Sequence, residues 1–152
     1  MQTKLLIKFK RLSKDFDHVP LPAYSTEGSS GMDIRAAIIK PLRLMPMTIE
    51  LVSTNLAVEI PLEFELQVRP RSGLAAKHGI GILNSPGTID SDYRGEIKII
   101  IINFGKDDFI IQPGERIAQL VVSKIYRAKL EEVEELNLSN RGEGGFGHTG
   151  KS

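Results

Sequence analysis

Cysteine occurs nowhere in the 152 residues of the sequence. Its absence excludes disulfide bonds, thiolate metal sites and a cysteine nucleophile, and it fits a reducing compartment. Charge of one sign is also missing, because 20 Lys and Arg residues are opposed by 19 Asp and Glu residues, for a net charge of +1. With no global field to steer the protein toward a nucleic-acid backbone, any phosphorylated ligand must be held by local groups.

Long apolar runs are the second absence. The N-terminal residues mix four basic side chains with apolar ones, and no uninterrupted stretch is long enough for a signal peptide or a membrane span. We therefore expect an intracellular, cytoplasmic protein that binds neither membranes nor nucleic acids stably. A chain of this length is expected to form one domain.

Short strand patterns separated by turn residues dominate what is present. Strands are expected at residues 48–54, 56–60, 64–69, 95–103, 107–111 and 117–124, which are β-branched or alternate in polarity. Residues 4–10 are β-like but could be the edge of a helix, and the two prolines in 19–24 favour an extended edge segment. Many short strands indicate a β-sandwich or barrel. Short helices are possible at 73–78 and 130–136, where four glutamates indicate a solvated segment rather than a metal site.

The last eight residues, GFGHTGKS, fit the phosphate-binding P-loop pattern G-x-x-x-x-G-K-[ST]. That loop works between a strand and a helix, and here no helix follows Lys151 and no alternating strand–helix series precedes it. The five glycines of residues 141–152 and their small apolar surface instead predict a mobile tail. We divide the chain into a β domain at 1–137, whose first 19 residues carry no motif, and a lid at 138–152.

Four internal segments concentrate groups able to perform chemistry. In residues 31–36 (GMDIRA) Asp33 would begin a strand, where it could simply form a turn. In residues 69–79, Ser72 could cap a helix while Arg71 offers a guanidinium, together a phosphate site, although an exposed arginine beside a helix cap fits equally well. In residues 113–122 (PGERIAQLVV), Gln119 is the polar residue of an apolar strand and needs a partner if it faces inward.

The fourth segment, residues 84–96, is expected to form a hairpin with a wide tip. Asp90 and Asp92 would share one face if this stretch were a strand, and a carboxylate shielded from water could act as a general base near neutral pH. An acidic turn without chemical importance is the alternative. Tyr93 and Asn84 favour a ligand site, because they supply an aromatic surface and an amide able to bind a base edge.

In order and spacing these segments resemble the five motifs of the trimeric deoxyuridine triphosphatase (dUTPase) family, from about Pro20 to Gly150. The most specific matches are residues 70–74 (PRSGL), 87–96 (GTIDSDYRGE) and 141–147 (RGEGGFG). The resemblance implies an all-β, jelly-roll-like barrel that forms a homotrimer with shared active sites. It also implies hydrolysis of dUTP to dUMP and diphosphate with Mg²⁺, which keeps uracil out of DNA and supplies dUMP for thymidylate synthesis.

The same resemblance implies a role for each matching residue. Asp90 would deprotonate the water that attacks the α-phosphorus, and Asp33 would lie in the second shell of Mg²⁺. The other matching positions are carried over as substrate contacts to the phosphates, the base or the sugar. They are Arg71, Ser72, Gly73, Asn84, Gly87, Thr88, Ile89, Tyr93, Lys98, Gln119, Arg141, Phe146 and Gly147.

Within that set the expected tasks differ. Ser72 would bond the oxygen that bridges the α- and β-phosphates. Arg71 and Gln119 would contact phosphates, and Asn84 with the backbone near Lys98 would recognise uracil. Tyr93 would pack against the deoxyribose and exclude a 2′-hydroxyl. From the tail of a neighbouring subunit, Arg141 would pair with the γ-phosphate and Phe146 would stack on uracil.

Three alternatives are weaker. A P-loop NTPase needs the strand–helix series that is missing. A deoxycytidine triphosphate deaminase shares the broader fold superfamily, but residues 87–96 match the hydrolase version of this segment. A β domain that binds nucleotides without catalysis would not require the complete set of motifs.

Overall fold

The computed structural model describes residues 5–145. It contains twelve strands, one α-helix and one short 3-10 helix within that range. The helical elements are η1 (Lys14–Phe16) and α1 (Ser72–His78). The strands are β1 (Lys8–Arg11), β2 (Ala23–Tyr24), β3 (Gly31–Arg35), β4 (Leu42–Leu44), β5 (Ile49–Ser53), β6 (Leu56–Glu59), β7 (Phe64–Arg69), β8 (Ile80–Ile82), β9 (Gly87–Ile89), β10 (Lys98–Asn103), β11 (Phe109–Ile111) and β12 (Arg116–Lys124).

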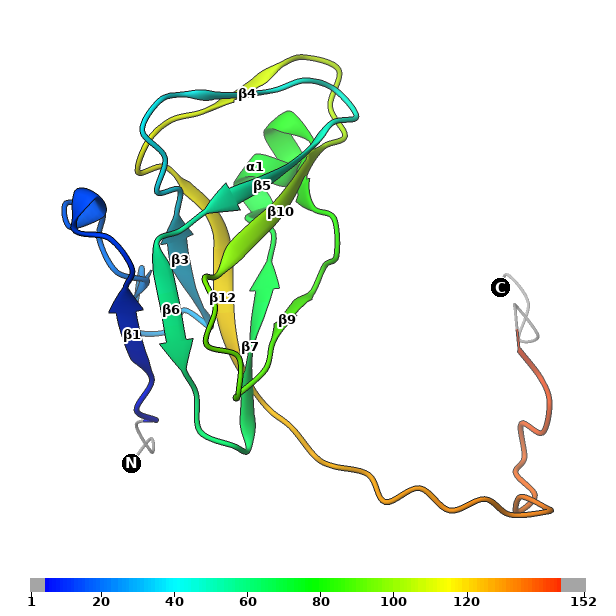
Figure 1. The fold of residues 1–152 in the computed structure, drawn as a ribbon. Coiled ribbons are helices and arrows are strands. Elements are labelled where there is room, and N and C mark those ends of the chain that lie inside the picture. Colours follow the sequence, from blue (N-terminus) through cyan, green and yellow to red (C-terminus); the bar gives the residue numbers. More distant parts are fainter. Residues whose placement is uncertain (1–4, 146–152) are drawn as a thin grey trace.

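These strands form four antiparallel sheets. The largest has the order β2-β3-β12-β7-β9, and a second has the order β5-β10-β8. Two-stranded sheets β1-β6 and β4-β11 complete the body (Figure 1). One apolar core joins the two larger sheets, with Leu66 and Leu120 contributed by one and Val52 and Ile99 by the other. The fold is all-β and jelly-roll-like, as the sequence predicts.

Strand β10 explains the most apolar run of the sequence. Ile97, Ile99, Ile101 and Ile102 are between 0 and 4% exposed within the single chain. Strand β10 is central in its sheet, between β5 and β8, and a strand covered on both faces carries a continuous apolar run. A contact between subunits is therefore not needed to explain the apolar residues at 97–102.

Most predicted strands are confirmed, and β7 has the predicted bounds. Of the predicted segment 4–10, residues 8–10 lie in strand β1 and the described residues form no helix, while residue 4 lies outside the described residues. Strand β2 is the edge of its sheet, as the two prolines near it indicate. The sequence did not reveal β4, β8 and β9, which are only three residues long. Asp33 lies in the middle of β3 rather than at a strand start.

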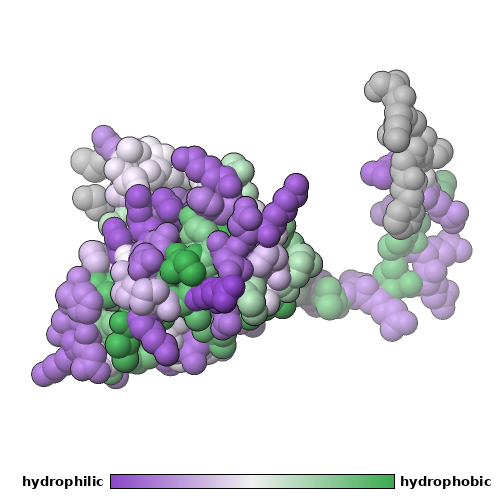
Figure 2. Space-filling model, turned by 90° about the horizontal axis from the view of Figure 1, so that it is seen from above, coloured by the Kyte–Doolittle hydropathy of each residue, from purple (hydrophilic) through white to green (hydrophobic). Residues whose placement is uncertain are grey.

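The predicted helix at 130–136 is absent, since those residues form no regular secondary structure. Four glutamates repel one another there, and Leu130 and Leu136 are 88% and 86% exposed, with nothing to pack against. An isolated helix of this length is unstable in water without such packing. After β12 the chain runs away from the body in both views (Figures 1 and 2).

Candidate active site

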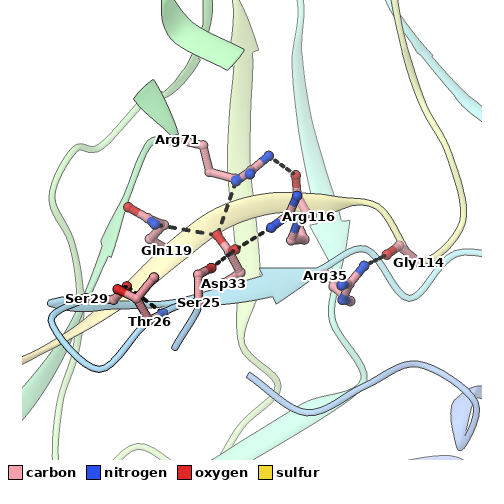
Figure 3. A network of polar contacts seen from close by, with 9 residues as sticks. All are labelled: Ser25, Thr26, Ser29, Asp33, Arg35, Arg71, Gly114, Arg116 and Gln119. Atoms are coloured by element: carbon pink, nitrogen blue, oxygen red, sulfur yellow. Dashed lines mark hydrogen bonds and ion pairs between the residues drawn. The ribbon is translucent and has the colours of Figure 1, made fainter. Parts of the chain in front are cut away.

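Asp33 is the centre of a polar cluster on the largest sheet. The residue is 8% exposed, and its carboxylate accepts hydrogen bonds from four side chains (Figure 3). The donors are Arg116 Nη1 at 3.0 Å, Arg71 Nε at 3.2 Å, Ser25 Oγ at 3.2 Å and Gln119 Nε2 at 3.5 Å. Together with Asp33, these residues come from four separate parts of the chain. We call Asp33, Arg71, Arg116, Ser25 and Gln119 the Asp33 cluster.

The electrostatics of the Asp33 cluster favour an ionised carboxylate. Burial is the largest single influence and raises the pKa of Asp33, but Arg71, Arg116 and Ser25 together outweigh it, so that the pKa lies below its ordinary value. One carboxylate and two guanidinium groups leave the cluster with a net positive charge. Because the side chains of Arg71 and Arg116 remain 24% and 44% exposed, they can contact an anion from solvent.

The strand register explains why Gln119 reaches Asp33, because the two residues are direct partners on β12 and β3. Arg116 is three residues from Gln119, and simple alternation would place it on the opposite face. A register shift between Arg116 and Ala118 breaks the alternation, and such irregularities redirect side chains. Both residues therefore contact one carboxylate.

Helix α1 begins beside this cluster, but not as expected. Arg71 is the N-cap residue, it makes no side-chain capping bond, and Ser72 is the first helical residue. The prediction that Ser72 caps the helix is therefore wrong, because the Arg71 side chain is drawn to Asp33 and fixes the entry into the helix one residue earlier. Ser72 and Gly73 are exposed, and no atom lies within 4 Å of a Cβ built on Gly73. A ligand can approach this turn closely.

The segment from Asn84 to Lys98 is not a hairpin. Strand β9 pairs with β7 in the largest sheet, whereas β10 pairs with β5 and β8 in another. Residues 90–97 therefore cross from one sheet to the other, and we call them the crossover. Asp90 and Asp92 lie beyond the end of β9, so the strand that would have put them on one face does not exist there.

Most predicted ligand groups of this segment are accessible. Asn84, Thr88, Asp90 and Lys98 are exposed, and Tyr93 is 46% exposed. Gly87 and Ile89 are buried in β9. A Cβ on Gly87 would lie 3.1 Å from Val68 Cβ and 3.2 Å from Asn84 Nδ2, so the absence of a side chain at 87 keeps the Asn84 turn close to the sheet.

Register separates Asp90 from the Asp33 cluster within one chain. Asp33 is aligned with Gln119 and Arg69, whereas Ile89 is aligned with Leu66. Three strand spacings and about four residues along the strand then lie between Asp33 and Asp90, which places them roughly 15–20 Å apart. A single chain thus carries two groups of candidate residues that do not meet.

The third group is in the C-terminal segment. Arg141 is exposed, and its Nε donates a hydrogen bond to Gly144 O at 2.6 Å inside a local turn in which Gly142 N donates to Ser139 O at 3.1 Å. The segment stands clear of the body, so Arg141 contacts neither of the other groups (Figure 1). Phe146 and Gly147, like most of the P-loop-like pattern, lie outside the described residues.

Ser25 and Arg116 are the cluster members that the sequence did not identify. Neither lies at a position for which the pattern indicates a ligand contact, and only the fold brings them to Asp33. Between residues 5 and 145, no group of three or more His, Cys, Asp or Glu side chains could hold a metal ion. In the same range, no helix is long and apolar enough to cross a membrane.

Comparison with known proteins agrees with this geometry. The family model dUTPase matches residues 17–150. The chain belongs to the dUTPase family. It is 56% identical over 133 residues, 88% of this chain and 91% of the relative, to the deoxyuridine 5'-triphosphate nucleotidohydrolase of Fusobacterium nucleatum. It is 49% identical to the enzyme of that name from Caldanaerobacter subterraneus, over 96% of this chain and 98% of the relative.

A solved structure of the same family shows the same fold. The dUTPase of Staphylococcus bacteriophage 80alpha with dUPNHPP matches with a TM-score of 0.86 and 29% identity, over 96% of this chain and 99% of that one. The jelly-roll-like fold and the family assignment are thereby confirmed. The tasks assigned to individual residues stay predictions.

Proposed function

We propose that this protein hydrolyses dUTP to dUMP and diphosphate with Mg²⁺, and so keeps uracil out of DNA and supplies dUMP. The family assignment supports this activity, and the relatives that carry a name are dUTP hydrolases rather than deaminases. The observation that carries the proposal is the Asp33 cluster, which directs two guanidinium groups to the surface where α1 begins. Since nucleoside triphosphates are made and used inside cells, the substrate implies a cytoplasmic enzyme.

The Asp33 cluster would bind the triphosphate. Asp33 takes one N–H of each arginine, and Arg116 O accepts another from Arg71 Nη1. The other donors of the two guanidinium groups are left for phosphate oxygens, which accept bidentate hydrogen bonds. Ser72 and Gly73 at the exposed start of α1 would contact the oxygen between the α- and β-phosphates, where charge accumulates as the diphosphate departs. Gln119 would contact the phosphates from β12.

The side chains fit Mg²⁺ that is held mainly by the substrate. The oxygens of Asp33 already accept four hydrogen bonds, so a contact through water suits this carboxylate better than direct ligation. Mg²⁺ commonly keeps several waters and is bound through substrate phosphates. When bound, the ion would neutralise charge on the triphosphate; Asp33 would orient its water shell.

Asp90 would act as the base. Its exposure lets it hold a water molecule from which it accepts a proton during attack on the α-phosphorus. Tyr93 would lie against the deoxyribose, while Asn84 and the backbone near Lys98 would bind uracil. A site whose buried polar groups form hydrogen bonds with uracil rejects cytosine. Cytosine carries an amino donor where uracil carries a carbonyl acceptor, so the polar groups of the site that face this position would lose their hydrogen bonds.

The separation of Asp90 from the Asp33 cluster supports a site shared between subunits. Reacting groups must come within a few ångströms of one substrate, so Asp90 of one copy would face the Asp33 cluster of another. We propose a homotrimer, a closed ring in which every copy contributes both parts. The tail of a third copy would add Arg141, Phe146 and Gly147 as a lid.

The test measures diphosphate release from dUTP, dCTP, dTTP, UTP and ATP with Mg²⁺. The wild type should turn over dUTP rapidly and the others little, and Asp90→Asn should lose at least about 1,000-fold in kcat. Asp107→Asn serves as the matched control, because Asp107 is an exposed aspartate in the loop between β10 and β11, away from the crossover. Rapid ATP hydrolysis, ammonia release from dCTP, or an active Asp90→Asn enzyme would overturn the proposal.

A further inference from the structure

The crossover is supported by the turn between β5 and β6, which no motif of the sequence includes. Three hydrogen bonds join the two: Asn55 N donates to Glu96 Oε1 at 2.9 Å, Thr54 Oγ1 donates to Ile97 O, and Ile97 N donates to Leu56 O at 2.7 Å. Thr54 and Asn55 are only 3% and 5% exposed. Hydrogen bonds shielded from water in this way hold a backbone firmly.

Asn55 also ties this support to the N-terminal segment. Its amide makes two bonds to the backbone of Ser13, with Ser13 N donating to Oδ1 and Nδ2 donating to Ser13 O, both at 2.8 Å. Asn55 has a φ of 59°, a conformation that asparagine tolerates better than most residues. The turn is thus fixed from one side by Ser13 and holds Glu96 on the other.

Glu96 also contacts Tyr93 through its backbone carbonyl. The Tyr93 hydroxyl donates to the backbone carbonyl of Glu96 at 2.9 Å. A Cβ on Gly95 would lie 2.4 Å from that hydroxyl oxygen, so the phenol end of the ring lies directly on the Gly95 backbone. Glu96 Oε2 is 3.7 Å from Lys98 Nζ. The orientation of the Tyr93 ring therefore depends on where the Glu96 backbone is held.

We propose that Glu96, anchored by the Asn55 backbone N–H, is a positioning residue that fixes the Tyr93 ring and thereby sets discrimination against ribonucleotides. This inference rests on the proposed function, in which Tyr93 lies against the deoxyribose. A ring free to shift by about 1 Å would leave room for a 2′-hydroxyl, and displacements of that size change rates by orders of magnitude. Glu96 itself need not touch the substrate.

The test compares kcat/KM for dUTP with that for UTP in the full-length protein. Glu96→Ala should lower the dUTP-to-UTP ratio by roughly tenfold or more. Glu96→Gln keeps an oxygen acceptor for Asn55 N–H and should restore most of the ratio. Glu63→Ala is the matched control: it removes an exposed ion pair with Lys124 and leaves the Asn55–Glu96 contact unchanged, so its ratio should equal that of the wild type.

A second variant tests the same inference even if Glu96→Ala does not fold. Tyr93→Phe removes only the hydroxyl bond to Glu96 O from a half-exposed ring, and should also lower the ratio. In a double-mutant cycle, adding Tyr93→Phe to Glu96→Ala should cost little more, because both act on one restraint. Parallel loss of dUTP and UTP turnover, or a ratio unchanged in Tyr93→Phe, would overturn the inference. Failure of the wild type to hydrolyse dUTP would instead contradict the proposed function.

Discussion

The Asp33 cluster and the crossover lie on the same β body but are held in place in different ways. In the cluster, the buried carboxylate of Asp33 holds two arginines, and its strand β3 is paired with β12, which carries Arg116 and Gln119. In the crossover, Asp90 and Tyr93 stand exposed between two sheets and depend on the turn at residues 54–56 for support. Under the proposed function, the groups for the phosphates are thus assembled inside one chain, whereas the site for the base and the sugar is completed by neighbouring copies of the chain.

The strongest test of this difference places a defect in the Asp33 cluster and a defect at Asp90 in different chains. Asp90→Asn and Arg71→Ala should each be nearly inactive. When the two are unfolded, mixed in equal amounts and refolded together, about a quarter of the sites should combine two intact halves and restore about a quarter of wild-type activity.

A matched mixture controls for this effect. Asp33→Asn mixed with Arg71→Ala should show no more activity than the average of the two variants measured separately, because both defects lie in the same half of the site. Recovery in this control, or none in the first mixture, would show that Asp90 and the Asp33 cluster do not meet across a subunit boundary.

Deleting residues 141–152 should remove about 99% of the activity while leaving the unfolding temperature and the number of subunits unchanged, because a lid excludes water only after substrate binds. Thermal unfolding, light scattering and diphosphate release check the three parts. Arg127→Ala, an exposed arginine earlier in the same segment, should remain active. Full turnover by the truncated protein would contradict the lid.

Arg71→Lys should lower kcat/KM for dUTP by roughly 10- to 100-fold, because a lysine cannot bond Asp33 and a phosphate with a planar fork. Arg71 Nε contacts Asp33 while Nη1 donates to Arg116 O at 3.3 Å, a geometry that one ammonium group does not reproduce. Arg43→Lys is the control, since Arg43 pairs with Asp108 between β4 and β11. Equal activity of the two variants would mean that Arg71 supplies charge alone.

The last prediction concerns stability: Asp33→Asn should lower the free energy of unfolding by about 1–3 kcal/mol at pH 7. The pKa of Asp33 is lowered in the folded protein from its ordinary value of 3.8, so the carboxylate stabilises the fold above that value. This stabilisation is lost as the pH falls through the lower, folded pKa. In urea titrations the difference between the two proteins should therefore be constant near pH 7 and shrink as the pH falls below 3.8, and a difference that stays constant would contradict the ion-pair account.

Strand patterns were readable where a strand is long and has one buried face. Residues 64–69 alternate strictly, and β7 has the expected bounds. Strands β4, β8 and β9 have three residues each, too few for a period to be recognised, and they exist because a neighbouring strand offers hydrogen bonds. At residues 130–136 helix propensity suggested a helix that has no surface to pack against.

Some residues of the candidate site could be identified from the sequence, and others could not. The motifs identified Asp33, Arg71, Gln119 and Asp90 as chemically important, and the structure does bring the first three together. Arg116 could not be found, because its contact depends on the register shift in β12. The Asn55–Glu96 contact was equally hidden, since it joins residues 41 positions apart.

The kind of chemistry can be inferred from the residues alone, because carboxylates, guanidinium groups and glycines at fixed spacing are local properties of the chain. Which of these groups meet depends on the tertiary structure. Antiparallel pairing puts Asp33 opposite Gln119 and leaves Asp90 at the other end of the sheet, since register is fixed by packing over the whole core. The proposed distribution of the site over several copies of the chain rests on that register, which no single motif contains.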